Sequence, residues 1–215
     1  MSKKTIIMLA CLALALMMGL SGTLAYFTDQ DSQVNVFTLG NVNITLKEEF
    51  VQNSKLMPNV EISKDAWIIN EGANAAYVWL TVAVPAPLDP CLELKWASGI
   101  APEGPADAKD ENSNDYKVYT VKIPAPLLPT ESTPKLLDGI MLSAHVDYQD
   151  GRFVMVAGET VTPIQYDLSQ VNIPVSAYAI QADGFQSFDD AYTAYGEQWG
   201  ALQVVIPTPA PTSAE

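Results

Sequence analysis

The chain offers few side chains that could support catalysis. Its one histidine is His145. A zinc peptidase needs two histidines at helical spacing and a nearby glutamate, so that ligand set is excluded. No Gly-x-Ser-x-Gly elbow and no Gly-rich phosphate loop occurs. His145 falls in an expected strand, where a structural role is commoner than a role as the base for a serine nucleophile. We expect no enzyme and no cofactor.

The acidic segment at residues 110–115 is the best candidate for a metal site. It places oxygen-bearing side chains at the first, third and fifth positions of a calcium loop. An EF-hand is excluded, because Asp115 replaces the required glycine and Val121 the required glutamate. A solvated loop is the default expectation, and another kind of calcium site stays open. Paired carboxylates for glycoside hydrolysis carry little weight among 25 acidic residues.

The charge balance limits the partners. The 215 residues include 11 Lys or Arg and 25 Asp or Glu, which gives a net charge of −14. A nucleic-acid-binding protein carries a basic face, so we expect no such partner. With 48% hydrophobic and 17% charged residues, the chain can bury a core.

The N-terminus has the plan of a secretory signal peptide. Two early lysines precede an uncharged apolar run at residues 6–20, and small residues follow, Thr23 and Ala25, before Tyr26. We expect cleavage between Ala25 and Tyr26, so that residues 1–25 touch the membrane only during export. The alternative is a retained anchor, although the apolar run is shorter than the roughly 20 residues that span a bilayer.

Cleavage would leave one domain and a tail. Removing residues 1–25 removes two lysines and Cys11, which leaves 9 basic and 25 acidic residues, a charge of −16. Cys91 is then the only cysteine, expected as a small buried hydrophobe. Residues 26–206 fit a single domain. Residues 207–215 alternate proline with small residues and are expected to be extended and solvated.

The apolar patterns between these ends are mostly those of strands. Strand patterns occur at residues 41–47, 76–84, 116–123, 141–148, 152–156 and 175–182. The pair Asp150-Gly151 predicts a tight hairpin turn between two of them. Nine of the 15 prolines lie between Pro85 and Pro134, which predicts long irregular loops, chiefly at residues 98–115.

One helix is expected near the C-terminus. Ser187 and Asp190 have the spacing of a capping box. An apolar stripe at helical spacing follows: Phe188, Ala191, Tyr192, Tyr195 and Trp199. The stripe is expected to pack on a sheet, with an aromatic ligand site as the alternative. Many short strands and one late helix indicate an all-β, antiparallel β-sandwich with one short amphipathic helix.

Four segments resemble the TasA/camelysin family of exported bacterial proteins. They are TLAYFTD at residues 23–29, NVFTLGNVNI at 35–44, VEISKDAWIINEG at 60–72 and AYAIQADGF at 177–185. The chain departs from the family pattern at Met57-Pro58-Asn59 and in its Pro/Thr tail.

The resemblance implies a jelly-roll sandwich. It also implies a signal peptide that is removed by a dedicated signal peptidase of the SipW type. It also implies secretion from a Gram-positive cell and a place at the cell surface or in the biofilm matrix. TasA-like members are fibre subunits there. Camelysin relatives have been classed as metallopeptidases, but this chain lacks the zinc-ligand set.

A structural matrix subunit is therefore the leading hypothesis. A secreted binding module that holds glycan or a partner protein through exposed aromatics is the alternative, and a hydrolase is the least favoured. Cleavage would place two aromatics, Tyr26 and Phe27, at a free end, and strand-like residues follow at Val34, Val36 and Phe37. We expect residues 26–37 to pair with a neighbouring subunit's sheet and form filaments. The alternative is that they fold back as the first strand of their own sheet.

Overall fold

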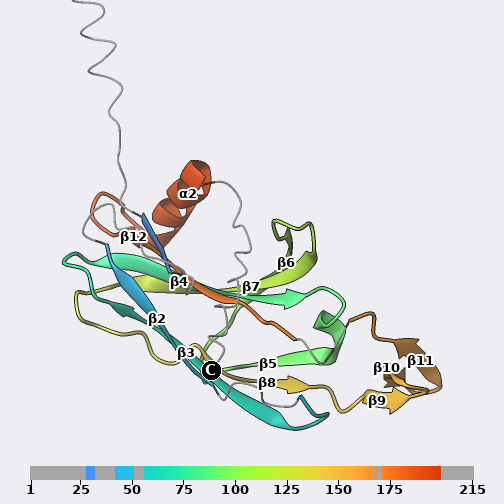
Figure 1. The fold of residues 1–215 in the computed structure, drawn as a ribbon. Coiled ribbons are helices and arrows are strands. Elements are labelled where there is room, and N and C mark those ends of the chain that lie inside the picture. The colour runs from blue at the N-terminus through green and yellow to red at the C-terminus, as the bar shows by residue number, and fades with distance from the viewer. Residues whose placement is uncertain (1–27, 32–41, 51–55, 167, 169–170, 200–215) are drawn as a thin grey trace, which may run out of the picture.

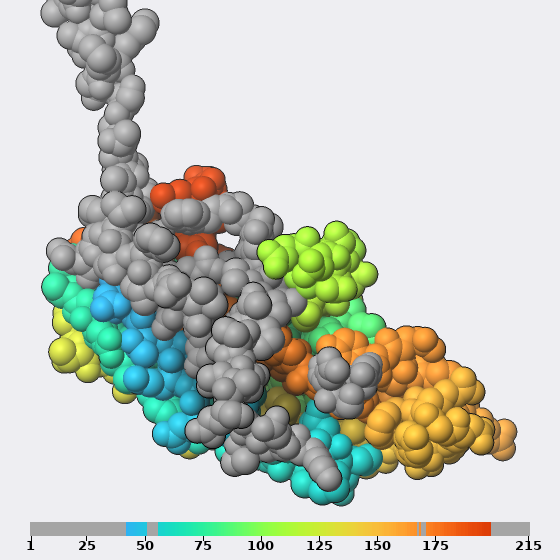
Figure 2. Space-filling model, in the orientation of Figure 1, coloured from blue at the N-terminus to red at the C-terminus, as the bar shows by residue number. Residues whose placement is uncertain are grey.

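The computed structural model describes residues 28–31, 42–50, 56–166, 168 and 171–199. Two antiparallel sheets form a sandwich, and a third, smaller sheet projects from one end (Figures 1 and 2). The expected signal peptide, its cleavage site at Thr23, Ala25 and Tyr26, and the expected tail at 207–215 lie outside the described residues. The predicted all-β sandwich with one late helix is confirmed within the described part of the chain.

The five-stranded sheet has the order β1-β12-β4-β7-β6. Its strands are β1 (Thr28–Asp31), β12 (Val175–Gln181), β4 (Ala76–Pro85), β7 (Asp115–Leu127) and β6 (Glu103–Lys109). The four-stranded sheet has the order β2-β3-β8-β5. Its strands are β2 (Ile44–Phe50), β3 (Glu61–Asn70), β8 (Leu137–Leu142) and β5 (Leu92–Trp96).

The small sheet and the helices complete the structure. The small sheet has the order β11-β10-β9. Its strands are β11 (Thr160–Pro163), β10 (Arg152–Ala157) and β9 (Val146–Gln149), and the helices are the short 3-10 helix η1 (Asp89–Cys91) and α2 (Phe188–Trp199). The chain crosses between the two large sheets from β1 to β2, from β3 to β4, from β4 to β5, from β5 to β6 and from β7 to β8. The first and last described strands are neighbours. These crossings suit the jelly-roll class that the resemblance implies.

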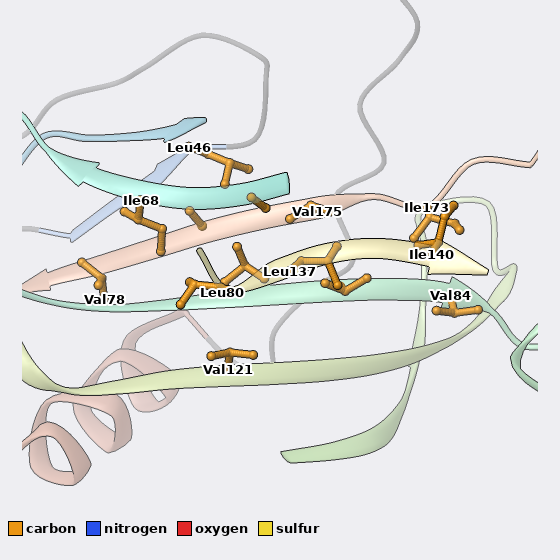
Figure 3. Packing of buried hydrophobic residues seen from close by; sticks show 14 of the residues in the cluster. Leu46, Ile68, Val78, Leu80, Val84, Val121, Leu137, Ile140, Ile173 and Val175 are labelled. Carbon is orange, nitrogen blue, oxygen red and sulfur yellow. The ribbon is translucent and has the colours of Figure 1, made fainter. Parts of the chain in front are cut away.

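The core fills the space between the two large sheets. Strand β4 lies in the middle of its sheet, and all ten of its residues are buried. Side chains from β2, β3 and β8 meet those of β4, β7 and β12 between the sheets, as Figure 3 shows for Leu46, Ile68 and Leu80. The doubly apolar pattern at residues 76–84 therefore identified a central strand correctly.

Most predicted strands are confirmed, with shifted ends. The strand predicted at 41–47 is β2, which begins at Ile44. The predicted hairpin at Asp150-Gly151 joins β9 to β10, and both turn residues have positive φ, 51° and 80°. Such a pair of φ values is what a tight two-residue hairpin requires.

Strand β7 is longer than predicted. We expected it to stop before Pro124, but it continues to Leu127. The pairing with β4 jumps from Ile123–Val78 to Leu127–Ala76, so the intervening residues bulge out of the ladder. A bulge tolerates prolines because its residues need not donate ladder hydrogen bonds.

The prediction of an irregular loop at residues 98–115 was wrong in part. Residues 103–109 form the edge strand β6, which pairs with β7. The ion pairs Lys117–Asp107 (2.5 Å) and Lys109–Asp115 link the two strands. An edge strand needs partners on one side only, which is why Pro105 fits there.

The predicted helix is confirmed as α2. The backbone N–H of Asp190 donates to Ser187 Oγ at 3.2 Å, which caps the helix. Phe188, Ala191 and Tyr195 are buried against the outer face of the five-stranded sheet. On that face they meet Tyr77 and Trp79 of β4 together with Tyr178 of β12, and the side chain of Trp199 lies outside the described residues. The stripe therefore packs on the sheet, as expected.

Candidate functional site

The candidate site is the side of β12 that β1, the edge strand of the five-stranded sheet, covers. Strand β1 pairs antiparallel with it, from Thr28 opposite Ile180 to Asp31 opposite Ala177. In the single chain, residues 28–31 thus fold back on their own sheet, which is the alternative arrangement given above. The other residues expected in the assembly strand, Tyr26, Phe27, Val34, Val36 and Phe37, lie outside the described residues.

The side of β12 that faces β1 is suited to pairing with another strand. The residues that face β1 are Ala177, Tyr178, Ala179 and Ile180, whose side chains are at most 2% exposed. Natural edge strands avoid pairing with foreign strands through charges, prolines or bulges. None of these lies in the segment 177–180. If β1 were absent, β12 would present unpaired backbone groups that a second strand could satisfy.

The described part of β1 pairs with a short stretch of this edge. Within the described residues it forms four residue pairs with β12, whereas β12 and β4 form seven. Its sequence, Thr-Asp-Gln-Asp, contains two aspartates, a residue type depleted in strands. Strand β1 also lies beside β2, at the seam between the two large sheets. A polar strand at the edge of a sheet can leave more readily than a central strand.

The opposite edge of this sheet is built differently. Strand β6 carries Pro105, and its charged residues Asp107 and Lys109 are engaged with β7. These are the features that block edge-to-edge pairing. The outer side of β6 is therefore protected against the addition of a strand, whereas the side of β12 that β1 covers has no such protection. The sequence patterns predicted the strand at 175–182, but nothing local marked it as an acceptor edge.

His145 does not lie in a strand as predicted. Strand β8 ends at Leu142, and the N–H of His145 donates to Ser143 Oγ at 3.3 Å, which bends the chain into a turn before β9. His145 Nδ1 lies 3.2 Å from the same Oγ. The serine is buried and the imidazole exposed, whereas a nucleophile must reach its substrate. The geometry fits the structural interpretation of both residues.

The acidic segment 110–115 forms the turn between β6 and β7. The Asp110 carboxylate accepts hydrogen bonds from the N–H groups of Asn112 and Asn114 and from the Asn114 amide. Burial raises the pKa of Asp110, but these bonds outweigh it and leave the pKa below its usual range. The carboxylate thus bonds to groups of its own turn, and these contacts involve no metal ligand from elsewhere in the described chain.

The described residues hold no group of three or more His, Cys, Asp or Glu that could bind a metal ion. Cys91 is 3% exposed and lies in the main core, as predicted. Burial, together with the charge of Asp89, raises the pKa of its thiol.

The comparisons with known proteins agree with the N-terminal motifs. The model of the camelysin metallo-endopeptidase family matches residues 2–82. The resemblance to the TasA/camelysin family is confirmed. The match ends inside β4 and covers less than half of the chain, so the segment at 177–185 rests on the sequence motif alone. No curated protein and no solved structure matches.

The residues that match the metallo-endopeptidase family do not contain a histidine-based zinc-ligand set. The matched residues contain no histidine, because the chain's one histidine is His145. The resemblance to a family of exported proteins suggests an extracellular or surface location. In the part of the chain that the structure describes, no helix is long and apolar enough to span a bilayer.

Proposed function

We propose that this chain is a secreted structural protein of the cell surface or biofilm matrix. It is a fibre-forming subunit that assembles through its mature N-terminal strand. The observation that supports this most is the apolar, uncharged edge of β12, covered by strand β1. A chain that carries both a donor strand and its acceptor edge can exchange the strand with a second copy.

Strand exchange gives an open assembly. The donor strand of one copy pairs with β12 of the next, whose own donor pairs with a third copy. This head-to-tail contact does not close on itself, so it yields filaments. Exchanged and intrachain strands make the same ladder hydrogen bonds, so protein concentration decides between them.

Charge opposes this association. The mature chain would carry 9 basic and 25 acidic residues, a net charge of −16. Salt screens repulsion between exposed charges beyond about 8 Å at physiological ionic strength. Filaments should therefore grow faster as the salt concentration rises.

The assembly strand can be tested by truncation. A chain that begins at Tyr26 should form filaments that lengthen with salt, whereas a chain that begins at Thr38 lacks β1 and should form none. Light scattering across a salt series measures growth, and electron microscopy separates filaments from amorphous aggregates. A synthetic peptide of residues 26–37 should bind the shortened chain. Equal polymerisation by a folded shortened chain would show that this strand is not the connector.

Export is tested by the mass of the secreted protein. The mature chain should begin at Tyr26 after cleavage by the dedicated signal peptidase. Mass spectrometry of the culture supernatant reads this directly. A protein found only in membranes, with residues 1–25 intact, would contradict the proposal.

The proposal assigns no catalytic role. Purified mature chain should show no proteolysis of casein that a chelator removes and zinc restores. A positive result in both steps would mean that oxygen ligands among the acidic residues hold zinc.

A further inference from the structure

A groove lies on the outer side of the five-stranded sheet, between the start of α2 and the start of β6. Its volume is about 590 Å³, within the range of roughly 300–1,000 Å³ that is typical of ligand sites. The apolar part of its wall comes from Tyr77 of β4 and Phe188 of α2, whose rings meet edge to face at 5.7 Å. Figure 1 shows α2 and β6 on the same side of the sheet.

The polar part of the wall holds charges of both signs. Lys122 Nζ lies 2.8 Å from Glu103 Oε2 and 4.5 Å from the centre of the Tyr192 ring. Burial lowers the pKa of Lys122, but Glu103 and Tyr192 outweigh it and leave the pKa raised, so the ammonium stays charged. Asp189 adds a second carboxylate, and Gln186 adds an amide with a donor and an acceptor.

The charges of the groove are already compensated. Lys122 pairs with Glu103, and Asp189 lies in the first turn of α2, where the helix dipole offsets its charge. The net charge of −14 further disfavours an anion. A hydroxyl group both donates and accepts hydrogen bonds, so it can bind the ammonium, the carboxylates and the amide together. Tyr77 and Phe188 are 7% and 5% exposed, so they form an apolar floor beside these polar groups.

We propose that this groove binds a neutral, hydroxyl-rich ligand, namely a short stretch of uncharged glycan. The glycan site goes beyond the structural role and does not include β1, because β12 lies between β1 and the β4 wall of the groove. A matrix subunit with such a site would attach its filaments to polysaccharide.

The test uses sugars of one size and different charge. The mature chain, labelled with nitrogen-15, is titrated with the neutral trisaccharides chitotriose, cellotriose and maltotriose. The controls are the cationic glucosamine trimer and the anionic trigalacturonate. At least one neutral sugar should shift the amide signals of residues 186–189 with a Kd of about 1 mM or tighter. The charged sugars should bind at least about five-fold more weakly.

Variants then locate the site. Glu103→Ala and Gln186→Ala should each weaken binding about five-fold, because each removes a hydrogen-bonding side chain from the groove wall. The matched controls are Glu111→Ala and Gln165→Ala, which are exposed outside the groove and should leave Kd unchanged. Light scattering on the same samples reads assembly separately.

Three outcomes would overturn the proposal. They are the absence of shifts with every neutral sugar at about 10 mM, tighter binding of a charged sugar, and equal weakening by the control variants. None of them bears on strand exchange, and a failure of filament growth would leave the glycan site standing.

Discussion

At the scale of single residues, the side chain of Asn70 makes three hydrogen bonds that no sequence motif predicted. It ends β3, is fully buried and lies within the segment that resembles the TasA/camelysin family. Its side-chain N–H groups donate to the carbonyls of Asn74 (2.8 Å) and Leu127 (2.9 Å), and its Oδ1 accepts the N–H of Gly72 (2.9 Å). The Asn-x-Gly spacing thus joins the turn before β4 to the end of β7.

Replacing Asn70 should therefore be costly. Asn70→Ala leaves two carbonyls and one N–H without their partner, and buried unsatisfied groups cost about 1–3 kcal/mol each. We expect the free energy of unfolding to fall by about 3 kcal/mol in a urea titration. Asn112→Ala, in the exposed turn after β6, is the matched control and should change it by less than about 0.5 kcal/mol. Similar losses in the two variants would contradict the role given to Asn70.

Glu48 makes the stability depend on pH. It pairs with Lys64 at 3.3 Å on the inward side of β2, and among the described residues its Oε1 has no hydrogen-bond partner. Burial raises the pKa of Glu48 and outweighs the opposing effect of Lys64. The folded state therefore holds this proton more tightly than the unfolded state, and the resulting stability is lost as pH rises through the folded pKa.

Glu48→Gln removes this titration. Relative to the variant, the wild-type chain should lose stability as the pH rises above the ordinary glutamate pKa of about 4.3. Urea unfolding of both chains at a series of pH values measures the difference. A relative gain for the wild type would mean that the attraction of Lys64 dominates.

Chemistry at this scale was only partly predictable from the sequence. The lack of a zinc-ligand set follows from the single histidine alone. The position of His145 does not, because the Ser143 turn interrupts an apolar run that reads as one continuous strand. The Lys122–Glu103 pair of the groove joins residues far apart in sequence and has no local signal.

At the scale of elements, alanine substitutions at two glycines distinguish the effect of close packing from the effect of conformational entropy. A Cβ on Gly139 of β8 would lie 2.6 Å from the backbone oxygen of Ile62 in β3, whereas one on Gly196 of α2 would meet nothing within 4 Å. Gly139→Ala should destabilise the chain by about 1–3 kcal/mol, since the two strands must separate. Gly196→Ala should stabilise it by about 0.5–1 kcal/mol. Thermal unfolding of both variants checks this, and a loss of stability for Gly196→Ala would contradict the exposed position of that residue.

Elements with strong local signals were predictable. Strand β4 was predicted from its apolar residues on both faces. The β9–β10 hairpin was predicted from Asp150-Gly151, and α2 from its capping residues and apolar stripe. Strand β6 was missed because Gly104 and Pro105 break its pattern, and the pairing with β7 that stabilises it is not local. The extension of β7 was missed because a bulge, which tolerates proline, cannot be seen in the sequence.

At the scale of the whole molecule, the decisive feature is the neighbour of β12. The sequence patterns predicted a sandwich, but they could not place the first strand, because sheet order depends on pairs between distant segments. The structure puts β1 on an apolar edge that would otherwise be open. Whether that strand comes from the same chain or from the next is the question on which the proposed function depends.

Disulfide cross-linking between two variants, each with one added cysteine, answers it. Asp29 lies opposite Ala179 in the β1–β12 ladder, and opposed residues of antiparallel strands are about 4.5–5.5 Å apart, within disulfide reach. One mature chain carries Asp29→Cys and the other, of different mass, carries Ala179→Cys. The native Cys91 is buried, and each variant incubated alone is the control. Strand exchange predicts a disulfide between the two chains that forms on mixing and increases with salt. A third chain carries both substitutions. If it closes the disulfide within one chain while the mixture yields no cross-link above the controls, β1 stays on its own sheet and the assembly proposal is wrong.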